Sequence, residues 1–339
     1  PRGFPSFLMA MPLWLKQKLW IPDLIKNELN YKGEVLFPEH HESHAASAFY
    51  PSPFDRAAFL TMDGVGEWAT SSYGRAAGSK IDILKELHFP HSLGLLYSAF
   101  TYFTGFRVNS GEYKVMGLAP YGEPRYVQTI LDHLIDLKED GSFKMNMEYF
   151  DFSAGLKMTN DRFARLFGGP PRKRESELRQ RDMDLARSIQ EVTEQIMLRM
   201  ARHVKQETNE ENLVLAGGVS LNCVGNGKLL RSGLFKDIWI QPAAGDAGGA
   251  LGSALAVYFQ HRSQAEPTPR LKIDQQGSLL GPRYSDEAIE NFLQQNNISF
   301  RRYEDETLYD KTSDYLIAEK VIGWFQGRME FGPRALGNR

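Results

Sequence analysis

Short apolar runs separated by turn residues fill the chain between residues 34 and 89. The stretch AAFLTMDGVGEWATSSYG predicts a strand, a glycine-containing turn and a second strand, and residues 81–87 predict a third strand. The turn carries Asp63, followed by Gly64 and Gly66. Because glycine leaves neighbouring backbone N–H groups uncovered, this hairpin tip places a carboxylate beside free hydrogen-bond donors.

Helical periodicity marks two later stretches. Residues 93–103 are apolar and predict a helix. Residues 183–205 predict a long helix, because large apolar residues recur there at spacings of four and three positions and therefore share one face. That face consists of Leu185, Ile189, Val192, Ile196, Met200 and Val204. The stripe predicts packing against the core.

Strands and helices alternate between residues 212 and 260. NLVLAGG predicts a buried strand ending in glycines, SLNCVGNGKLLRSG a helix, DIWIQP a strand and DAGGALGSALAVYFQ a helix. This β-α-β-α order predicts a parallel sheet whose ligand-binding loops follow the carboxyl ends of the strands. The fold class indicated is α/β.

The two ends of the chain depart from this pattern. FPSFLMAMPLWLKQKLWIPDL, near the start, predicts a loop and an amphipathic helix that packs on the body, with an interfacial anchor as the alternative. Its prolines and lysines break any membrane span. Residues 264–276 are rich in proline and glutamine. We therefore divide the chain into a helical segment at 1–33, a domain at 34–262, a linker at 263–280 and the start of a second domain at 281–339.

Composition excludes several classes of protein. A length of 339 residues suits two domains or one large duplicated domain, and 42% apolar with 24% charged residues is ordinary for a globular chain. The net charge of −2 argues against a nucleic-acid-binding surface, which normally shows a clustered basic excess. The single cysteine, Cys223, excludes an internal disulfide and a zinc site built from thiolates, and it fits a reducing cytoplasm.

Three of the eight histidines lie within five residues, in the segment HHESH. If a helix begins near Glu39, then His40 and His44 share one face and His41 points elsewhere. Such a pair offers two imidazole nitrogens to a metal ion, which then needs a third ligand from a distant loop. The alternative is a pair of surface or helix-capping histidines.

Asp246 lies between a predicted strand and a helix, with Gly245, Gly248 and Gly249 around it. A helix N-terminus offers free N–H groups and a positive dipole end, which suits a phosphate. The alternative is that Asp246 serves only as the helix N-cap. The segment LAGGVSLN repeats this design, and two such junctions on neighbouring parallel strands make a crevice that suits a nucleotide.

The chain resembles the O-carbamoyltransferases, the family of nodulation protein U and of antibiotic-carbamoylating enzymes such as the one acting on tobramycin. The resemblance covers residues 34–339 and rests on five ordered motifs: HHESHAASAFYPSPFDRAAFLTMDGVGEW, GEYKVMGLAPYG, LAGGVSLNCVGNGKL, PAAGDAGGALGSAL and GRMEFGPRALGNR. It implies an actin-like ATPase domain (ASKHA, a duplicated ribonuclease-H-like fold) related to the tRNA threonylcarbamoyl transferases. A YrdC-like α+β domain is expected to follow.

The resemblance also implies a two-step reaction that uses carbamoyl phosphate, ATP and Mg²⁺. The second domain makes a carbamoyl-adenylate, and the first transfers the carbamoyl group to a hydroxyl of a small molecule and releases AMP. A divalent metal is implied at His40, His44 and Asp246; the family suggests iron, while ligand type alone suits manganese or zinc equally. Neither a nucleic acid nor a membrane is expected as a partner.

The other site residues are carried over from the same motifs. Asp63 is expected to take the proton of the attacking hydroxyl, and Glu112 and Lys114 are similar to pocket-lining residues, with a structural ion pair as the alternative for Lys114. The nucleotide-binding positions implied are Gly64, Gly66, Gly217, Gly218, Asn222 and Gly245. Carbamoyl phosphate is expected at Arg328, Arg334 and Arg339, because guanidinium forks suit phosphate oxygens.

Two parts of the family pattern are not found in these residues, namely the first strands of the actin-like domain and most of the YrdC-like domain. We therefore expect a truncated chain, whose exposed sheet edge favours association such as a homodimer. Two rival functions stay open. One is a tRNA threonylcarbamoyl-transferase-like enzyme, which shares the metal pair, and the other is a nucleotide-binding module without catalysis.

Overall fold

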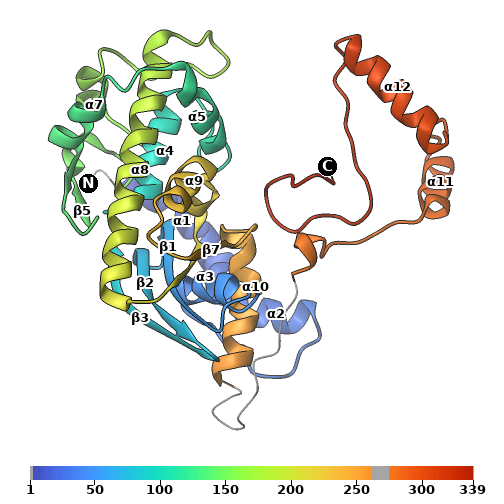
Figure 1. The fold of residues 1–339 in the computed structure, drawn as a ribbon, viewed down its shortest axis with the longest axis horizontal. Coiled ribbons are helices and arrows are strands. Elements are labelled where there is room, and N and C mark those ends of the chain that lie inside the picture. The colour runs from blue at the N-terminus through green and yellow to red at the C-terminus, as the bar shows by residue number, and fades with distance from the viewer. Residues whose placement is uncertain (1–2, 262–274, 339) are drawn as a thin grey trace. The chain divides into compact units, whose positions relative to one another are not determined.

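The computed structural model describes residues 3–261 and 275–338. The chain divides into two compact units, residues 1–272 and 273–339. A five-stranded sheet lies at the centre of the first unit (Figure 1). Its strands, in the order β3-β2-β1-β6-β7, are β3 (Lys80–His88), β2 (Ala69–Ala77), β1 (Arg56–Gly66), β6 (Asn212–Ala216) and β7 (Asp237–Ile240).

The strand directions confirm the predicted mixed α/β fold. Strands β1, β2 and β3 are antiparallel neighbours, as the hairpin pattern predicts, whereas β1, β6 and β7 run parallel, as the β-α-β-α order predicts. A separate pair is formed by β4 (Ile135–Leu137) and β5 (Phe143–Met145). Within the described residues there is one large sheet rather than the two of a duplicated fold.

Helices cover both faces of the sheet. α3 (His40–Phe49) packs on one face, with α10 (Asp246–Ala256) packed against α3, and α4 (Leu93–Phe103) and α8 (Gln180–Thr208) pack on the other face (Figure 1). This arrangement follows from the alternation of side chains along β1. Ala58, Leu60 and Met62 join the core beneath α4 and α8, whereas Thr61 contacts α3.

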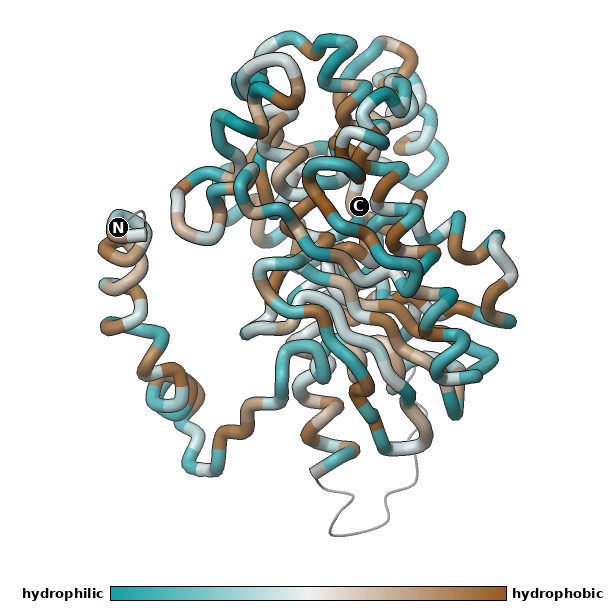
Figure 2. Tube along the Cα trace, turned by 90° about the vertical axis from the view of Figure 1, so that its left-hand side faces the viewer, coloured by the Kyte–Doolittle hydropathy of each residue, from teal (hydrophilic) through white to brown (hydrophobic). Residues whose placement is uncertain are grey.

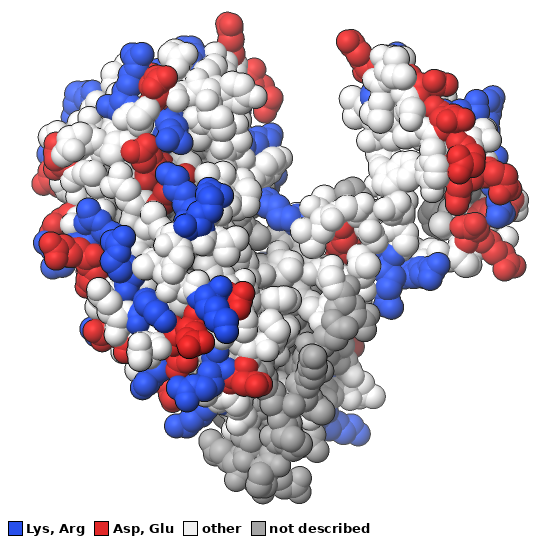
Figure 3. Space-filling view, in the orientation of Figure 1, with Lys and Arg blue, Asp and Glu red and all other residues white. Residues whose placement is uncertain are grey.

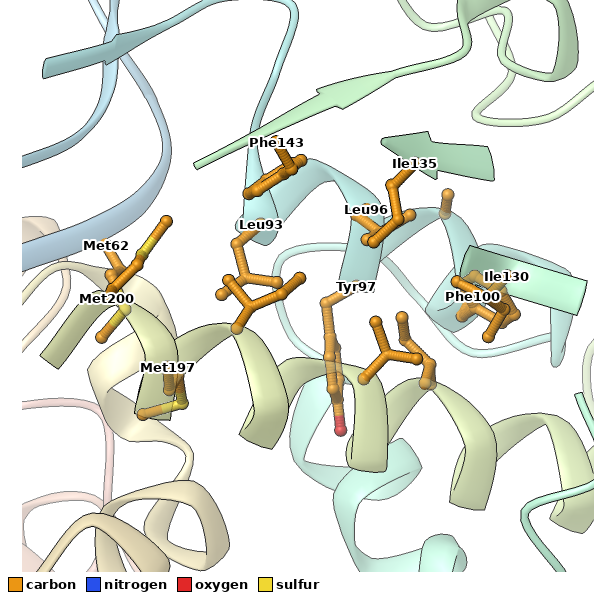
Figure 4. Close-up of a cluster of buried hydrophobic side chains, with 14 of the residues drawn as sticks. Met62, Leu93, Leu96, Tyr97, Phe100, Ile130, Ile135, Phe143, Met197 and Met200 are labelled. Carbon is orange, nitrogen blue, oxygen red and sulfur yellow. The ribbon is translucent and has the colours of Figure 1, made fainter. Parts of the chain in front are cut away.

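The predicted helix at 183–205 is confirmed as the central part of α8, and its whole apolar stripe is buried. Leucine, phenylalanine and methionine side chains from α4, α8 and β1 form one continuous core (Figure 4).

The remaining elements of the unit are α5 (Glu112–Leu118), α6 (Val127–Thr129), α7 (Asp161–Leu166), α9 (Cys223–Arg231), the short turns η1 (Lys18–Trp20), η2 (Ala119–Tyr121), η4 (Met147–Tyr149) and η5 (Gly218–Leu221), and the π-helical η3 (Ile130–Leu134) and η6 (Val257–His261).

The N-terminal segment forms two helices, α1 (Phe4–Lys16) and α2 (Ile21–Glu28), neither of which has a buried residue. The prediction that this segment packs on the body is therefore wrong. Apolar residues occupy most positions of α1, whose turns near the N-terminus are largely brown and pale in Figure 2, so the sequence specifies no single face for packing on the body. One hydrogen bond, from Ser6 Oγ to the Ala154 carbonyl, connects α1 to the loop after η4. Among the helices in the described ranges, none is long and apolar enough to cross a membrane.

The described part of the second unit contains α11 (Asp286–Gln295), α12 (Asp305–Ile317) and the turn η8 (Gln276–Ser278), and it has no strand. Its last residues form a closed loop, because the Gln326 N–H donates to the Asn338 carbonyl at 2.9 Å. Inside this loop, Glu330 Oε1 accepts from the N–H groups of Leu336 and Asn338, at 2.9 and 2.8 Å. A buried carboxylate thus organises the loop that carries Arg328 and Arg334.

Candidate metal centre

The histidine segment forms the first turns of α3, which begins at His40 with Glu39 as its N-cap. The helix register confirms that His40 and His44 share a face, since their ring centroids lie 4.6 Å apart. His41 points away from them and is buried. Its Nδ1 hydrogen-bonds Thr61 Oγ1 at 2.7 Å, and its Nε2 donates to the Ala69 carbonyl at 3.1 Å.

Asp63 lies on the same face of β1 as Thr61, because it follows Thr61 by two residues. Its Oδ2 lies 3.1 Å from His40 Nε2 and 3.3 Å from His44 Nε2. Its Oδ1 accepts a hydrogen bond from the Gly218 N–H at 2.9 Å. The pairing of β1 with β2 shifts between Met62 and Gly66, so Asp63 sits where the ladder is interrupted.

Asp246 is the first residue of α10, and Gly245 occupies the N-cap position. The alternative that Asp246 serves only as the N-cap is therefore wrong. Its Oδ1 lies 3.6 Å from His40 Nε2 and 3.7 Å from His44 Nε2. One ligand atom from each of His40, His44, Asp63 and Asp246 lies within 4.8 Å of all the others. We call these four residues the His/Asp cluster.

Close packing of α3 against α10 brings Asp246 to the histidines. Gly252 makes this possible, because a Cβ atom there would lie 1.7 Å from the Ser43 carbonyl oxygen. Gly66 has the same role for His40: a Cβ atom at residue 66 would lie 2.1 Å from His40 Cδ2. Both glycines are therefore required by the space that the cluster occupies.

Contacts within the cluster shift the pKa values of Asp63 and His40. Burial acts to raise the pKa of Asp63, but hydrogen bonds from His40, His44 and the Gly218 N–H hold that pKa well below its usual range. The hydrogen bond to Asp63 raises the pKa of His40. His41, beside them, behaves differently: burial lowers its pKa to about 4, so it is neutral at pH 7.

The donor set fits a divalent cation. Four atoms about 2.1 Å from one ion are separated by roughly 3.0–3.4 Å in octahedral or tetrahedral arrangements. The nitrogen–oxygen separations here, 3.1–3.7 Å, are close to these values. Imidazoles bind metal ions in their neutral form, so the two carboxylates supply the negative charge that a divalent ion balances. One feature differs from most metal-bound imidazoles: His44 Nδ1 is buried and has no hydrogen-bond partner among the described residues.

The glycine-rich junctions meet beside the cluster. Gly217 has a φ of 87°, and a Cβ atom there would lie 2.3 Å from the Met62 carbonyl oxygen, so only glycine fits between β6 and β1. Its N–H donates to the Ala244 carbonyl at 2.7 Å, which ties this loop to the one before α10. Gly64 anchors α4, since its carbonyl accepts from Ser92 Oγ at 2.6 Å.

Other predicted site residues contact groups outside the cluster. Glu112 Oε1 accepts from Ser98 Oγ at 3.0 Å and from the Asn109 N–H at 2.9 Å. Lys114 is exposed, with its Nζ 5.9 Å from the centre of the Phe106 ring. Arg328 and Arg334 belong to the second unit, and Arg339 lies outside the described residues.

Sequence reasoning missed two features of this region. Asp63 was expected as a proton acceptor, yet it lies among the possible metal ligands; the alternation Thr61–Asp63 was the available signal. Gln190 and Glu194 were missed altogether, because the α8 pattern was interpreted as packing alone. Their signal is a pair of polar residues four positions apart on a largely buried helix.

Comparison with known proteins identifies the family. Residues 1–255 match the carbamoyltransferase N-terminus, and residues 313–339 match the carbamoyltransferase C-terminus. The chain belongs to the carbamoyltransferase family. Its relatives in this family include NolNO, a nodulation protein of Sinorhizobium fredii, which is 37% identical over 343 residues, or 98% of this chain and 46% of that protein.

Two further relatives differ from each other in their similarity to this chain. An uncharacterized protein of Synechocystis sp. is 57% identical over 349 residues, covering 100% of this chain and 57% of that protein. The 3'-hydroxymethylcephem-O-carbamoyltransferase of Amycolatopsis lactamdurans is 25% identical over 237 residues, covering 67% of this chain and 38% of that enzyme. This carbamoyltransferase chain thus spans about half the length of the curated relatives it matches.

Among solved structures, HypF of T. kodakarensis matches 72% of this chain and 39% of its own chain, at 16% identity and a TM-score of 0.37. That similarity is too low to support an argument about the fold.

Proposed function

We propose that this chain carries the transfer site of an O-carbamoyltransferase, which moves a carbamoyl group onto a hydroxyl of a small molecule. Family membership supports carbamoyl transfer, and the relative named 3'-hydroxymethylcephem-O-carbamoyltransferase supports a hydroxyl acceptor. The observation that carries the proposal is the His/Asp cluster, whose members come from three elements, α3, β1 and α10, and converge at the carboxyl ends of parallel strands.

A divalent cation held by His40, His44, Asp63 and Asp246 would neutralise charge on a departing phosphate group and polarise the carbamoyl donor. The donor would be a carbamoyl-adenylate made from carbamoyl phosphate and ATP. The N-terminus of α10 and the glycine turn at residues 64–66 would offer backbone N–H groups for its phosphate. The N–H groups of Gly217 and Gly218 are already engaged by the Ala244 carbonyl and by Asp63.

We assign Asp63 to cation binding rather than to proton abstraction. Both of its oxygens already accept hydrogen bonds, and its pKa is held well below the usual range, so its carboxylate is a weak base. In the second unit, Arg328 and Arg334 of the closed loop at 326–338 are the proposed ligands of carbamoyl phosphate.

A small-molecule acceptor fits the surface better than a tRNA does. On the face shown in Figure 3, Lys and Arg side chains of the first unit are intermixed with Asp and Glu side chains. The net charge of the chain is −2. A tRNA-binding protein needs a clustered basic surface to neutralise phosphates.

The test is cation binding by the purified chain, followed by transfer. We expect close to one bound divalent ion per chain by elemental analysis, and release of AMP from ATP when carbamoyl phosphate and a hydroxyl acceptor are added. Asp246→Asn keeps the size of the side chain and removes a ligand charge, so it should weaken Co²⁺ binding at least about tenfold with an unchanged melting temperature.

The matched control is Asp161→Asn, because Asp161 is also an exposed first residue of a helix, α7, away from the cluster. It should bind Co²⁺ as the unmodified chain does. A chain that holds no divalent ion, or an Asp246→Asn variant with full affinity, would contradict the proposed site.

A further inference from the structure

A buried polar network interrupts the apolar face of α8. Gln190 and Glu194 are each 1% exposed. The Gln190 amide makes four hydrogen bonds: its Oε1 accepts from the Tyr97 hydroxyl at 3.1 Å and from Asn222 Nδ2 at 2.9 Å, and its Nε2 donates to Glu194 Oε1 at 2.8 Å and Asn222 Oδ1 at 3.0 Å. Figure 4 shows Tyr97 reaching from α4 toward α8. Polar groups at such depth are costly unless every one is paired.

Glu194 fixes the direction of each bond in this network. A carboxylate only accepts, so the amide nitrogen of Gln190 faces Glu194 and its oxygen faces the Tyr97 hydroxyl. At the far end, the Gly225 N–H donates to Asn222 Oδ1 at 3.0 Å, which orients the Asn222 amide to match. Lys228 pairs with the second oxygen of Glu194. The two amides therefore have one compatible arrangement.

Asn222 ends the loop that holds Asp63. Within this loop the Ser220 N–H donates to the Gly217 carbonyl at 2.9 Å, and the Asn222 N–H donates to the Val219 carbonyl at 2.9 Å. The Gly218 N–H of the same turn donates to Asp63 Oδ1 at 2.9 Å. A shift of Asn222 therefore moves the donor that orients the Asp63 carboxylate.

We propose that Gln190 is a positioning residue for the cation site, acting through Asn222 and the Gly218 N–H on Asp63. This inference rests on the proposed cation site. It also gives Asn222 a role different from direct nucleotide binding, because its oxygen and one of its N–H groups are engaged by Gln190 and Gly225. The rigid amide pair holds the loop in the one conformation that aims Asp63 at His40 and His44.

The decisive variant is Gln190→Glu, which keeps the shape of the side chain but replaces the donating nitrogen with an acceptor facing Glu194 and Asn222. We expect the Co²⁺ dissociation constant to rise by about tenfold or more, the effect typical of groups that orient a metal ligand. The matched control is Gln180→Glu on the same helix. Gln180 Nε2 also donates to an acid four residues on, Asp184, but Gln180 makes no contact with Asn222. Its Co²⁺ affinity should stay within about twofold.

Coupling to Asp63 separates positioning from general stability. In an Asp63→Asn background, Gln190→Glu should add less than about twofold to the loss of Co²⁺ affinity, because the residue it acts on is already changed. If Gln190→Glu lowers affinity by the same factor in both backgrounds, or leaves it unchanged in a folded protein, the proposal is wrong.

Two further measurements cover the remaining outcomes. If Gln190→Glu does not fold, Asn222→Ser is tested instead. Serine retains an acceptor for the Gly225 N–H but loses the two hydrogen bonds between residue 222 and Gln190. Full Co²⁺ affinity in Asn222→Ser would overturn the proposal. If the unmodified chain binds no Co²⁺, the proposed function fails separately. In that case the NMR signals of the His40 and His44 ring nitrogens test the positioning role, because these rings face Asp63 without any ion. Those signals should shift in Gln190→Glu, while the signals of exposed His133 should not. Unchanged His40 and His44 signals would overturn the positioning role.

Discussion

At the scale of single residues, the cluster depends on side-chain directions set by the register of α3 and β1. His40 and His44 could be paired from their spacing, and the family motifs added Asp246. Asp63 was assigned a different role, because its direction depends on β1, whose pairing with β2 is interrupted next to it. A local interruption of a ladder leaves little mark in the sequence, so this part of the site required coordinates.

Gly66→Ala tests the contact between the hairpin and His40. The new methyl group would occupy the position of the His40 ring, so the ring must move away from Asp63 and Asp246. We expect Co²⁺ affinity to fall by about tenfold or more in titrations followed by absorbance. The control is Gly117→Ala, at a helical position where the methyl group meets open space. Equal affinity in both variants would show that His40 does not need its observed place.

His41→Ala should separate folding from cation binding. His41 is buried and bonds Thr61 and the Ala69 carbonyl, so its loss leaves a cavity and unpaired polar groups. We expect the free energy of unfolding in urea to fall by about 3 kcal/mol, with the stoichiometry of bound Co²⁺ unchanged. Asp246→Asn should instead weaken Co²⁺ binding and leave the free energy of unfolding unchanged. If His41→Ala lost Co²⁺ binding but kept the free energy of unfolding of the unmodified chain, His41 would instead be a ligand of the ion.

At the scale of elements, periodicity predicted most of the first unit. The spacing of apolar residues predicted α8, and β-α-β-α alternation predicted the parallel strands, because both patterns follow directly from burying one face. The same reasoning failed for α1, where apolar residues surround the helix and specify no face. Contacts between helices were also beyond prediction, since they depend on small residues such as Gly252 meeting a particular backbone atom.

Gly252→Ala tests whether the packing of α3 on α10 sets the site. A Cβ atom would overlap the Ser43 carbonyl, so the helices must separate and carry Asp246 away from the histidines. We expect a loss of about 1–3 kcal/mol in unfolding free energy together with weaker Co²⁺ binding. Gly249→Ala is the control on the same helix, because a methyl group there meets no atom within 4 Å. Normal Co²⁺ binding by a destabilised Gly252→Ala variant would contradict this link.

At the scale of the whole molecule, the candidate cation ligands and the candidate phosphate-binding arginines lie in different units. His40, His44, Asp63 and Asp246 all lie in residues 1–272, whereas Arg328 and Arg334 lie in residues 273–339. Strand–helix alternation predicted an α/β fold, and the chain length and motif order predicted a second unit; the sheet topology and the division of the chain agree with both. The described part of the second unit contains the two helices of the expected α+β pattern and none of its strands.

A chain of residues 1–261 should therefore keep the proposed cation site and lose the proposed carbamoyl phosphate site. We expect its Co²⁺ dissociation constant to stay within about twofold of the value for the longer chain. Isothermal titration with carbamoyl phosphate should show binding to the 339-residue chain alone. Binding of equal strength to the shorter chain would place that ligand in the first unit.

The ligands of the cluster differ sharply in their contact with solvent. The side chain of His44 is 0% exposed and that of Asp63 12%, whereas that of Asp246 is 82% exposed. The side chain of His40 is 30% exposed. An ion or a chelator would therefore reach the cluster from the side of Asp246 and His40, rather than from the side of His44 and Asp63. Under the proposed function, an incoming hydroxyl compound and a departing nucleotide would both approach the ion from this exposed side, so one would have to leave before the other could enter.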